Sequence, residues 1–498
     1  MFKKMLIANR GNIAVNIIRA CKELGIETIA IYSDVDKESM HVRYADKAYY
    51  IGEAKYKDDY RNFSKVIEIA LKEKVDVIHP GFGFLAQNIE FLKECKKLNI
   101  KVISDEWEKV EKFSDKIWMK EQAEKLGIPI VNGFEIKKEK DLEKLRKPLV
   151  IKPVNGWAGR GIQYVDSKDD IFKKLEIAKK ESKTIFNTNR LLAEEYIDNS
   201  YLIEVTVVGN AKEYVSLPTT DSSLRRKFQK IVSEAPAEYI DISIRKKIVE
   251  YAKKLSEKIS LNSMANFEFI VQKKNIYFLE LNPRLPVNYA VVEMLTGFNL
   301  IKQQISLAYD NIIQVEEIPL ENIKGNAFEC RLYAEDYFNK FEPCSGNIKQ
   351  LIMPGGKDVR VEFDYFSGDE VTSYYDSQIG RLLVKSLYRK EMVNKIRWAV
   401  AQTKISGIST TLPFIENVVN TKLFNEGKIV SDFITHVMRE RRFKKARQKE
   451  FVAAIVAALS YHNENEKKTI APRINLSKKD ASPWNILGRS KIIKKWGE

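Results

Sequence analysis

Short apolar segments alternate with helical patterns over the first 113 residues, and this alternation constrains the fold more than any other feature. Five segments are typical of buried strands, MLIAN, TIAIYS, KAYYIG, VDVIHP and KVIS, with patterns such as IAVNIIRACKELG and FSKVIEIALKEK between them. Because each intervening helix returns the chain to the same end of the sheet, the pattern predicts parallel pairing. We therefore predict an α/β protein that begins with a doubly wound parallel sheet.

Two glycine loops follow strands of this predicted sheet. Asn9-Arg10-Gly11 comes directly after the first strand, and HPGFGF, residues 79–84, follows the fourth. Both loops are expected at the carboxyl edge, where such sheets bind ligands. Either loop alone is better explained as a tight turn, and the sequence contains no GxGxxG to support a dinucleotide site.

A hairpin within residues 266–293, NFEFIVQKKNIYFLELNPRLPVNYAVVE, carries two acids in apolar strands. The patterns FEFIV and IYFLEL place Glu268 and Glu280 on adjacent antiparallel strands, with QKKN as the turn. Such carboxylates are costly unless paired or bound to a cation, and the amide oxygen of Asn282 adds a third hard ligand suited to Mg²⁺. The alternative is that the acids face solvent on an edge strand. Arg284 favours the metal site, since it places a planar cation able to grip an oxyanion beside these oxygens.

The segment LVIKPVNGWAGRGIQYV predicts a strand, a glycine loop and a second strand. Lys152 ends the first strand, and Gly156, Gly159 and Gly161 leave backbone N–H groups free to approach phosphate oxygens, which implies a mobile flap. No Gly-Lys-Ser/Thr opens a helix here, so the P-loop class is excluded. Downstream, the strand LLAEEYID ends near Tyr196, where backbone groups are suited to contact an adenine edge.

Basic residues gather between the glycine loop and the acidic hairpin, at Arg225, Arg226, Lys227 and Lys230. This cluster is either a solvated basic turn or a site for an anion. Residues 326–435 are β-rich and then helical, a mixed α+β pattern. Within them, Arg331 either points a second guanidinium into the site or forms a surface ion pair with Glu335 or Asp336.

Composition limits the classes of function. The 498 residues suggest about three domains, and the net charge of +16 favours acidic partners such as nucleotides or an acidic carrier protein. Nucleic acid is not expected, because Lys interleaves with Glu along helices and no aromatic-rich basic strand occurs. Neither a secretory leader nor a run of roughly 20 apolar residues is found, so we expect a cytoplasmic protein outside membranes. The four Cys and four His are scattered and predict no zinc or disulfide framework.

Ten motifs occur in order: IANRGNIA, HPGFGFL, SDK, the strand, loop and strand at Lys152, EEYI, RRKFQK with SEAP, FEF, LELNPR, ECRLYAED and YYDSQIG. With them the chain closely resembles the biotin carboxylase subunit of acetyl-CoA, propionyl-CoA or pyruvate carboxylases. The resemblance implies four segments: an N-terminal α/β domain over 1–113, an ATP-grasp domain over 114–325 with a mobile lid at about 130–203, a mixed α+β C-terminal domain over 326–440, and a basic helical tail over 441–498.

The resemblance also implies a reaction. An ATP-grasp ligase of this type phosphorylates bicarbonate with MgATP, and the carboxyphosphate breaks down to carboxylate N1′ of biotin. No Ala-Met-Lys-Met biotinylation site occurs in the chain. Biotin is therefore expected on a separate biotin carrier protein, with a carboxyltransferase subunit as a further partner and the chain itself as a homodimer.

Residue roles follow from the same resemblance. ATP phosphates are expected at Lys116, Lys152, Gly156, Gly159 and Gly161. The adenine is expected at Glu194, Tyr196 and Ile197. Mg²⁺, or Mn²⁺, is expected on Glu268, Glu280 and Asn282, with Glu268 also facing ATP. Bicarbonate and the biotin oxyanion are expected at Lys230, Arg284 and Arg331.

The sequence departs from the family at the bicarbonate site. Where the family has Glu-Met-Asn-x-Arg-x-Gln-Val-Glu-His, this chain has ELNPRLPVNY from Glu280 to Tyr289, so Asn288 replaces the glutamate that deprotonates bicarbonate. An amide is not a base, and losing a general base typically costs about 10²–10⁴-fold in rate. Three hypotheses remain: a carboxylase with a substitute base such as Glu204, a regulatory ATP-binding paralogue, and an ATP-grasp ligase that acts on another acid.

Overall fold

The computed structural model describes residues 1–55, 59–157, 159–226, 228–434 and 455–460. The chain divides into two units, Met1–His436 and Val437–Glu498. In the second unit, the described residues 455–460 are helical. The rest of the predicted basic tail, 441–498, lies outside the described residues, as does Lys227 of the basic cluster.

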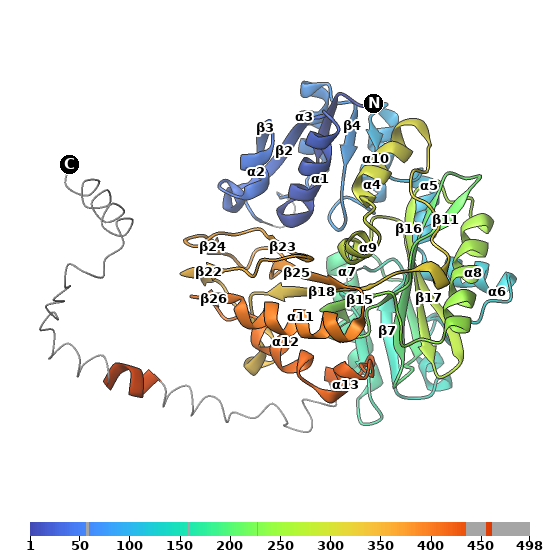
Figure 1. Cartoon of the computed structure of the whole chain (residues 1–498). Coiled ribbons are helices and arrows are strands. Elements are labelled where there is room, and N and C mark those ends of the chain that lie inside the picture. Colours follow the sequence, from blue (N-terminus) through green and yellow to red (C-terminus); the bar gives the residue numbers. More distant parts are fainter. Residues whose placement is uncertain (56–58, 158, 227, 435–454, 461–498) are drawn as a thin grey trace, which may run out of the picture. The chain divides into compact units, whose positions relative to one another are not determined.

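The first unit begins with a five-stranded sheet in the order β3-β2-β1-β4-β5 (Figure 1). Its strands, all parallel, are β1 (Lys4–Ile7), β2 (Glu27–Ser33), β3 (Lys47–Gly52), β4 (Val77–His79) and β5 (Lys101–Val102). The helices between them are α1 (Gly11–Glu23), α2 (Met40–Tyr44), α3 (Phe63–Glu73) and α4 (Ile89–Lys97). The strand order reverses at β1, which confirms the predicted doubly wound sheet.

The two glycine loops meet at this reversal. The side-chain amide of Asn9 donates to the carbonyl oxygens of Pro80 and Phe82, at 2.8 Å each. Gly11 begins α1 with φ +61°, in the left-handed region that favours glycine. Both loops therefore lie at the carboxyl edge of the sheet, as predicted.

A nine-stranded antiparallel sheet carries the acidic hairpin. Its order is β17-β16-β10-β12-β15-β18-β25-β23, with β11 paired to β10. Its strands are β10 (Tyr201–Gly209), β11 (Tyr214–Ser216), β12 (Thr220–Asp221), β15 (Val232–Ala235), β16 (Met264–Gln272), β17 (Asn275–Asn282), β18 (Asn326–Tyr333), β23 (Val359–Phe363) and β25 (Gln378–Ser386). The pairing of β15 with β18 crosses the predicted boundary between residues 325 and 326. The proposed central and C-terminal domains therefore share one sheet.

Register creates two rows of charged side chains across this sheet. The first row, on β10, β16 and β17, is Glu204, Glu268 and Glu280. The second row, on β18, β25 and β23, is Arg331, Arg381 and Glu362. Paired residues of neighbouring strands point to the same face, so each row presents its charges together.

A smaller sheet lies within the predicted lid region. Its order is β6-β9-β7-β8, from β6 (Gly133–Glu135), β7 (Leu149–Pro153), β8 (Gln163–Val165) and β9 (Leu191–Glu195), with α7 (Ile171–Phe186) beside it. The residues of its separate apolar core include Leu142, Leu149, Leu175 and Leu191. A separate core is what a lid needs in order to move as one body, and the mobility itself stays a prediction.

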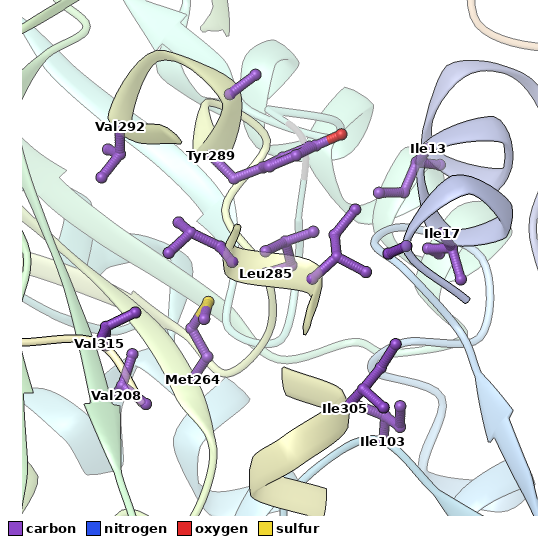
Figure 2. Close-up of a cluster of buried hydrophobic side chains, with 14 of the residues drawn as sticks. Ile13, Ile17, Ile103, Val208, Met264, Leu285, Tyr289, Val292, Ile305 and Val315 are labelled. Atoms are coloured by element: carbon purple, nitrogen blue, oxygen red, sulfur yellow. The ribbon is translucent and has the colours of Figure 1, made fainter. Parts of the chain in front are cut away.

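A hydrophobic cluster joins α1 to the segment that follows the acidic hairpin (Figure 2). Ile17 of α1 packs in it with Leu285, with Tyr289 of α9 (Tyr289–Thr296) and with Ile305 of α10 (Leu300–Asp310), all fully buried. Each such side chain contributes roughly 1.5–3 kcal/mol of burial free energy. The N-terminal sheet is thereby anchored to the loop that carries Arg284.

Further helices and short strands complete the unit. The helices are α5 (Trp107–Ser114), α6 (Lys116–Lys125), α8 (Ile242–Lys258), α11 (Arg389–Gln402), α12 (Leu412–Val419) and α13 (Lys422–Asn425). The short strands are β13 (Arg225–Arg226), β14 (Gln229–Lys230), β19 (Glu335–Asp336), β20 (Glu342–Pro343), β21 (Gly346–Asn347), β22 (Gln350–Ile352), β24 (Glu370–Val371) and β26 (Lys404–Ser406). Within the described ranges, no helix combines the length and the apolar character needed to cross a membrane.

Candidate active site

The acidic hairpin forms as predicted, and its acids face lysines. Strands β16 and β17 pair Glu268 directly with Glu280. The ammonium of Lys230 lies 2.7 Å from a carboxylate oxygen of Glu268 and 2.7 Å from one of Glu204. Lys116 Nζ lies 3.4 Å from Glu280 Oε2. The alternative that both acids face solvent is wrong for Glu268, which is buried between its neighbours.

The surroundings drive the pKa values of the two acids apart. Burial raises the pKa of Glu268 to about 7; Lys230 opposes the rise, and Glu204 and Glu280 add to it. Burial acts in the same direction on Glu280, but lysines, Lys116 first among them, outweigh it and lower the pKa to about 2. A cation between the two carboxylates would therefore offset the cost of burying the Glu268 charge and the repulsion from Glu280, and it would lower the pKa of Glu268.

The donor set of the hairpin fits a magnesium ion that is completed by substrate. Asn282 Nδ2 donates to Glu268 Oε1 at 3.0 Å, and Asn282 Oδ1 accepts from Arg284 Nη2 at 3.0 Å. Among the described residues, no group of three or more His, Cys, Asp or Glu gathers to hold a metal. The two carboxylates match the usual nucleotide-bound Mg²⁺, which takes further ligands from phosphates and water. The amide oxygen of Asn282 faces Arg284, so its predicted role as a third ligand requires the amide to turn.

A second charge cluster lies beside the glycine loop. Glu194 is buried, with Oε1 2.5 Å from Lys120 Nζ and its other oxygen paired with Lys152. Burial raises the pKa of Glu194, but the two lysines outweigh it and the pKa lies below its ordinary value. Lys116 Nζ donates to the carbonyl of Gly156 in the loop. Lys116 and Lys152 therefore both lie near Glu280 at the base of the glycine loop, and their contact with ATP phosphates stays a prediction.

Lys120 belongs to this cluster, and the sequence analysis missed it. Burial lowers the pKa of Lys120, and Glu194 opposes that effect. Lys120 stands four residues after Lys116, so both lie on one face of α6. That spacing is the sequence signal from which Lys120 could have been found.

The glycine loop packs against the basic cluster. Gly159 and Gly161 have φ +69° and +72°, and a Cβ on Gly159 would lie 3.0 Å from the Cβ of Phe228. Trp157, Gly159, Arg160 and Phe228 line one cavity. Of the described cations of the basic cluster, only Lys230 lines this cavity. Arg226 is buried, with Nη2 2.7 Å from Glu335 Oε1, and Arg225 is not in the lining. The anion-site interpretation therefore stays a prediction for Lys230.

The end of β9 holds the residues predicted to contact adenine. The Tyr196 N–H donates to Pro148 at 2.9 Å, and the Tyr196 ring packs edge to face on Tyr164, with centroids 5.0 Å apart. The Ile197 carbonyl accepts from Ser200 Oγ at 2.8 Å. The Glu194 side chain is committed to Lys120 and Lys152, and its backbone lies in a strand that is paired on both sides. The adenine assignment stays a prediction.

The cations that are predicted to bind anions line one cavity of about 500 Å³. Its lining includes Lys230, Arg284 and Arg331. Arg284 Nε donates to Gln87 Oε1 at 2.8 Å. Arg331 is buried, with Nε 2.8 Å from Glu329 Oε1 and Nη1 donating to the Lys230 carbonyl at 3.1 Å. The alternative surface ion pair of Arg331 with a neighbouring acid of β19 is therefore wrong.

Asn288 lies outside this cavity. Its side chain is buried, and Nδ2 donates to Thr220 Oγ1 at 3.0 Å and to Ser222 Oγ at 3.3 Å. Its neighbour Val287 lines the cavity, whereas Asn288 is not among the described lining residues. Glu204, the suggested substitute base, is also absent from that lining and is fully buried against Lys230. Neither residue is placed to take a proton from a ligand in the cavity.

Family comparisons agree with this arrangement of sites. Residues 1–110 match the biotin carboxylase N-terminal domain, residues 115–315 the ATP-binding domain of the carbamoyl-phosphate synthase L chain, and residues 329–436 the biotin carboxylase C-terminal domain. Biotin carboxylase 2 of Bacillus subtilis is 36% identical over 87% of this chain and 99% of that protein. The chain belongs to the biotin carboxylase family.

Other biotin carboxylases are similar along their whole length. The 2-oxoglutarate carboxylase small subunit of Hydrogenobacter thermophilus is 35% identical over 93% of this chain and 100% of that protein. The dimeric biotin carboxylase domain of that carboxylase, solved with MgADP, ADP and bicarbonate, superposes with a TM-score of 0.83 at 35% identity, covering 88% of this chain and 98% of that one. The Campylobacter jejuni biotin carboxylase has a TM-score of 0.82 at 33% identity, with 88% and 99% covered. The predicted family, ATP-grasp ligase class and α/β fold are confirmed, and the regulatory-paralogue and other-acid hypotheses are not favoured.

This biotin carboxylase also holds a buried arginine that the sequence analysis missed. Arg381 is 1% exposed, and its Nη2 donates to Asn12 Oδ1 at 2.7 Å. Its Nη1 lies 3.6 Å from Glu329 Oε1, the same oxygen that holds Arg331. Arg381 Nη1 also approaches the Val287 carbonyl, at 3.4 Å. Its Nε also lies 3.3 Å from Glu362 Oε2. No local pattern marks Arg381, because its partners come from four separate parts of the chain.

Proposed function

We propose that this biotin carboxylase performs ATP-dependent carboxylation of biotin with the cations that line the 500 Å³ cavity. The observation that carries the proposal is Lys230, held between Glu204 and Glu268 while its carbonyl accepts from Arg331. Lys230 thereby contacts both the carboxylates that are predicted to bind the metal and Arg331, which is predicted to bind biotin. Arg284, hydrogen-bonded to Asn282, links the same acids to bicarbonate.

The chain's own residues divide the work. Lys116 and Lys152 neutralise nucleotide phosphates beneath the glycine loop. Their positive charges stabilise the negative charge that develops on the phosphoryl group during transfer. Glu268, Glu280 and Asn282 would hold the magnesium ion, which supplies further charge neutralisation when bound. Bicarbonate and the ureido oxygen of biotin are bound by Lys230, Arg284 and Arg331. ATP and Mg²⁺ are the cofactors of the family, and biotin is its substrate.

The proposed assembly follows from the family. Biotin would be presented by a separate biotin carrier protein, and a carboxyltransferase subunit would use the carboxylated product. We also propose a homodimer, since the biotin carboxylase domain of the Hydrogenobacter 2-oxoglutarate carboxylase is a dimer. Domain limits of 1–113, 114–325 and 326–440, and a cytoplasmic location, belong to the same proposal.

The experiment that tests the function is bicarbonate-dependent release of ADP by the purified chain, with and without biotin, beside an Asn288→Glu variant. We expect release to require bicarbonate and to rise with biotin in the wild type. A wild type that binds ATP but stays silent, beside an active variant, would show that replacement of the base has abolished activity and would overturn the proposal.

A further inference from the structure

Among the described residues that line the cavity, four buried side-chain atoms lack a hydrogen-bond partner. Arg381 Nε still lies 3.3 Å from Glu362 Oε2, and the hydroxyl of Tyr375 faces Ser33. The other two atoms are Nη2 of Arg331, a donor, and Oδ1 of Asp364, an acceptor. Both residues line the cavity. A buried donor and a buried acceptor left unpaired in one cavity favour a ligand that satisfies both, because such groups are costly when unpaired.

The sheet places these two residues on one face. Arg331 pairs with Arg381, which pairs with Glu362, so the three side chains point the same way. Asp364 follows Glu362 by two residues, and its N–H continues the ladder to Ile379 at 3.3 Å, so Asp364 points to the same face. Two strand spacings of about 4.8 Å and a rise of about 6.6 Å separate the Cα atoms of Arg331 and Asp364 by roughly 12 Å.

The Asp364 carboxylate has one side committed to the protein. It accepts from the backbone N–H of Asn12 at the start of α1. A Cβ added to Gly11 would lie only 2.9 Å from Asp364 Oδ2. A side chain at position 11 would therefore push the carboxylate away, and glycine allows it to come this close. The commitment of this side to α1 fixes the carboxylate and leaves Oδ1 for a ligand.

The ureido ring of biotin offers a carbonyl acceptor and two N–H donors. We propose that Asp364 Oδ1 accepts a hydrogen bond from a ureido N–H while Arg331 Nη2 donates to the ureido carbonyl, which makes Asp364 a specificity-determining residue for biotin. Both side chains stand off the same face of the sheet, so a ring that lies over this face can meet both of them through hydrogen bonds of about 2.9 Å. The inference rests on the proposed function, because it takes biotin as the occupant of this cavity.

The charge of Asp364 provides a signature of this contact. Burial raises the pKa of Asp364 to about 7; Arg10 and Arg381 oppose the rise and Glu362 adds to it, with Tyr365 also facing the carboxylate. An ionised carboxylate accepts a stronger hydrogen bond than the protonated acid. Biotin binding should therefore strengthen as the pH rises through about 7.

The test is the KM for free biotin in bicarbonate-dependent ATP cleavage, measured for the wild type, Asp364→Asn and Asp358→Asn. Asparagine keeps one oxygen for the Asn12 N–H but turns an N–H donor toward the ureido N–H. We expect Asp364→Asn to raise the KM for biotin about 10-fold or more, to leave the KM for MgATP unchanged, and to flatten the pH dependence. Asp358 lies just before β23, is exposed and pairs with half-buried Lys395 at 3.5 Å, so we expect Asp358→Asn to make the same charge change without an effect on the KM for biotin.

Two results would overturn the inference while leaving the proposed function intact. One is an equal KM for biotin in Asp364→Asn and in a wild type that carboxylates biotin. The other is a wild-type KM for biotin that stays constant from one pH unit below to one above 7. A rise in both KM values with a lower melting temperature would assign Asp364 a structural role instead. A wild type that does not respond to biotin would overturn the proposed function itself, and this inference with it.

Discussion

Three cations of the site already have a glutamate partner, whereas Arg284 bonds to Gln87 and Asn282. Lys230 has Glu204 and Glu268, Arg331 has Glu329, and Lys152 shares Glu194 with Lys120. Burial lowers the pKa of Lys230, but its two glutamates outweigh this and hold the pKa above its ordinary value. Because a buried charge is costly when unpaired, these glutamates keep the cations charged and positioned before any anion arrives.

Glu194 is predicted to be the most costly of these partners to remove. In Glu194→Gln, the buried ammonium groups of Lys120 and Lys152 lose their counter-charge, so we expect the free energy of unfolding to fall by about 3 kcal/mol. Urea unfolding measures the loss. The control is Glu195→Gln, in which a half-buried neighbour keeps an oxygen that can accept from Asn132 and the loss stays below about 1 kcal/mol. Equal losses in the two variants would contradict the prediction.

A buried histidine predicts a pH dependence of stability. Burial lowers the pKa of His79 to about 3, from an ordinary value of 6.5. Below pH 6.5 the unfolded chain therefore binds a proton at His79 that the folded chain does not, and stability is lost as the pH falls. We expect the urea midpoint to drop more between about pH 7 and about pH 5, a range that spans the ordinary pKa, in the wild type than in His79→Asn. Parallel midpoints in the two proteins would exclude this contribution.

At the scale of elements, the site is assembled by a sheet and a loop. The sheet register aligns the hairpin acids with Glu204 and aligns Arg331 with Arg381. The loop contributes backbone N–H groups, which are in place only while its glycines keep their left-handed conformation. Loop geometry should therefore affect ATP binding without touching the charged residues.

Gly159→Ala tests the loop. Gly159 has φ +69°, and its new methyl group would lie 3.0 Å from Phe228, so strain of about 1–2 kcal/mol opposes the present conformation. We expect the Kd for MgATP to rise roughly 5- to 30-fold, measured by calorimetry. Gly355→Ala is the matched control, because its Cβ would meet nothing within 4 Å. Unchanged affinity in Gly159→Ala would separate the loop from nucleotide binding.

At the scale of the whole first unit, one sheet and one apolar cluster join the three family-matched regions. Strand β15 of the central region pairs with β18 of the C-terminal region. The hydrophobic cluster takes Ile17 from the N-terminal region, Tyr289 from the central region, and Ala327 and Leu383 from the C-terminal region. The cavity is lined by residues of all three regions, so the regions must fold together for the site to exist.

Truncation tests this dependence. A chain that ends at residue 325 loses the partner strand of β15 and exposes the hydrophobic cluster, so we expect an aggregating product without a cooperative melt. A chain that ends at His436 retains the first unit. We expect this chain to melt within about 2 °C of the full chain by calorimetry, because we expect their free energies of unfolding to differ by less than about 1 kcal/mol. A soluble, cooperatively melting 1–325 chain would disprove the shared-core account.

The sequence by itself determined the elements, the order of the motifs and the family. The N-terminal strands, the hairpin with Glu268 opposite Glu280 and the glycine loop at Lys152 were predictable, because periodicity and turn chemistry act over neighbouring residues. The lysines beneath the loop were partly predictable, since a helix brings Lys120 onto the face of Lys116.

Only the tertiary structure decided which charges became partners and which residues reached the cavity. Arg331 pairs with Glu329 on its own strand, and Arg381 reaches Asn12 across 369 positions of sequence. Asn288, at the position of the family's base, turns away from the cavity to Thr220, while Asp364 turns toward it. These outcomes depend on sheet register and on contacts between distant segments, and local sequence patterns carry no information about either.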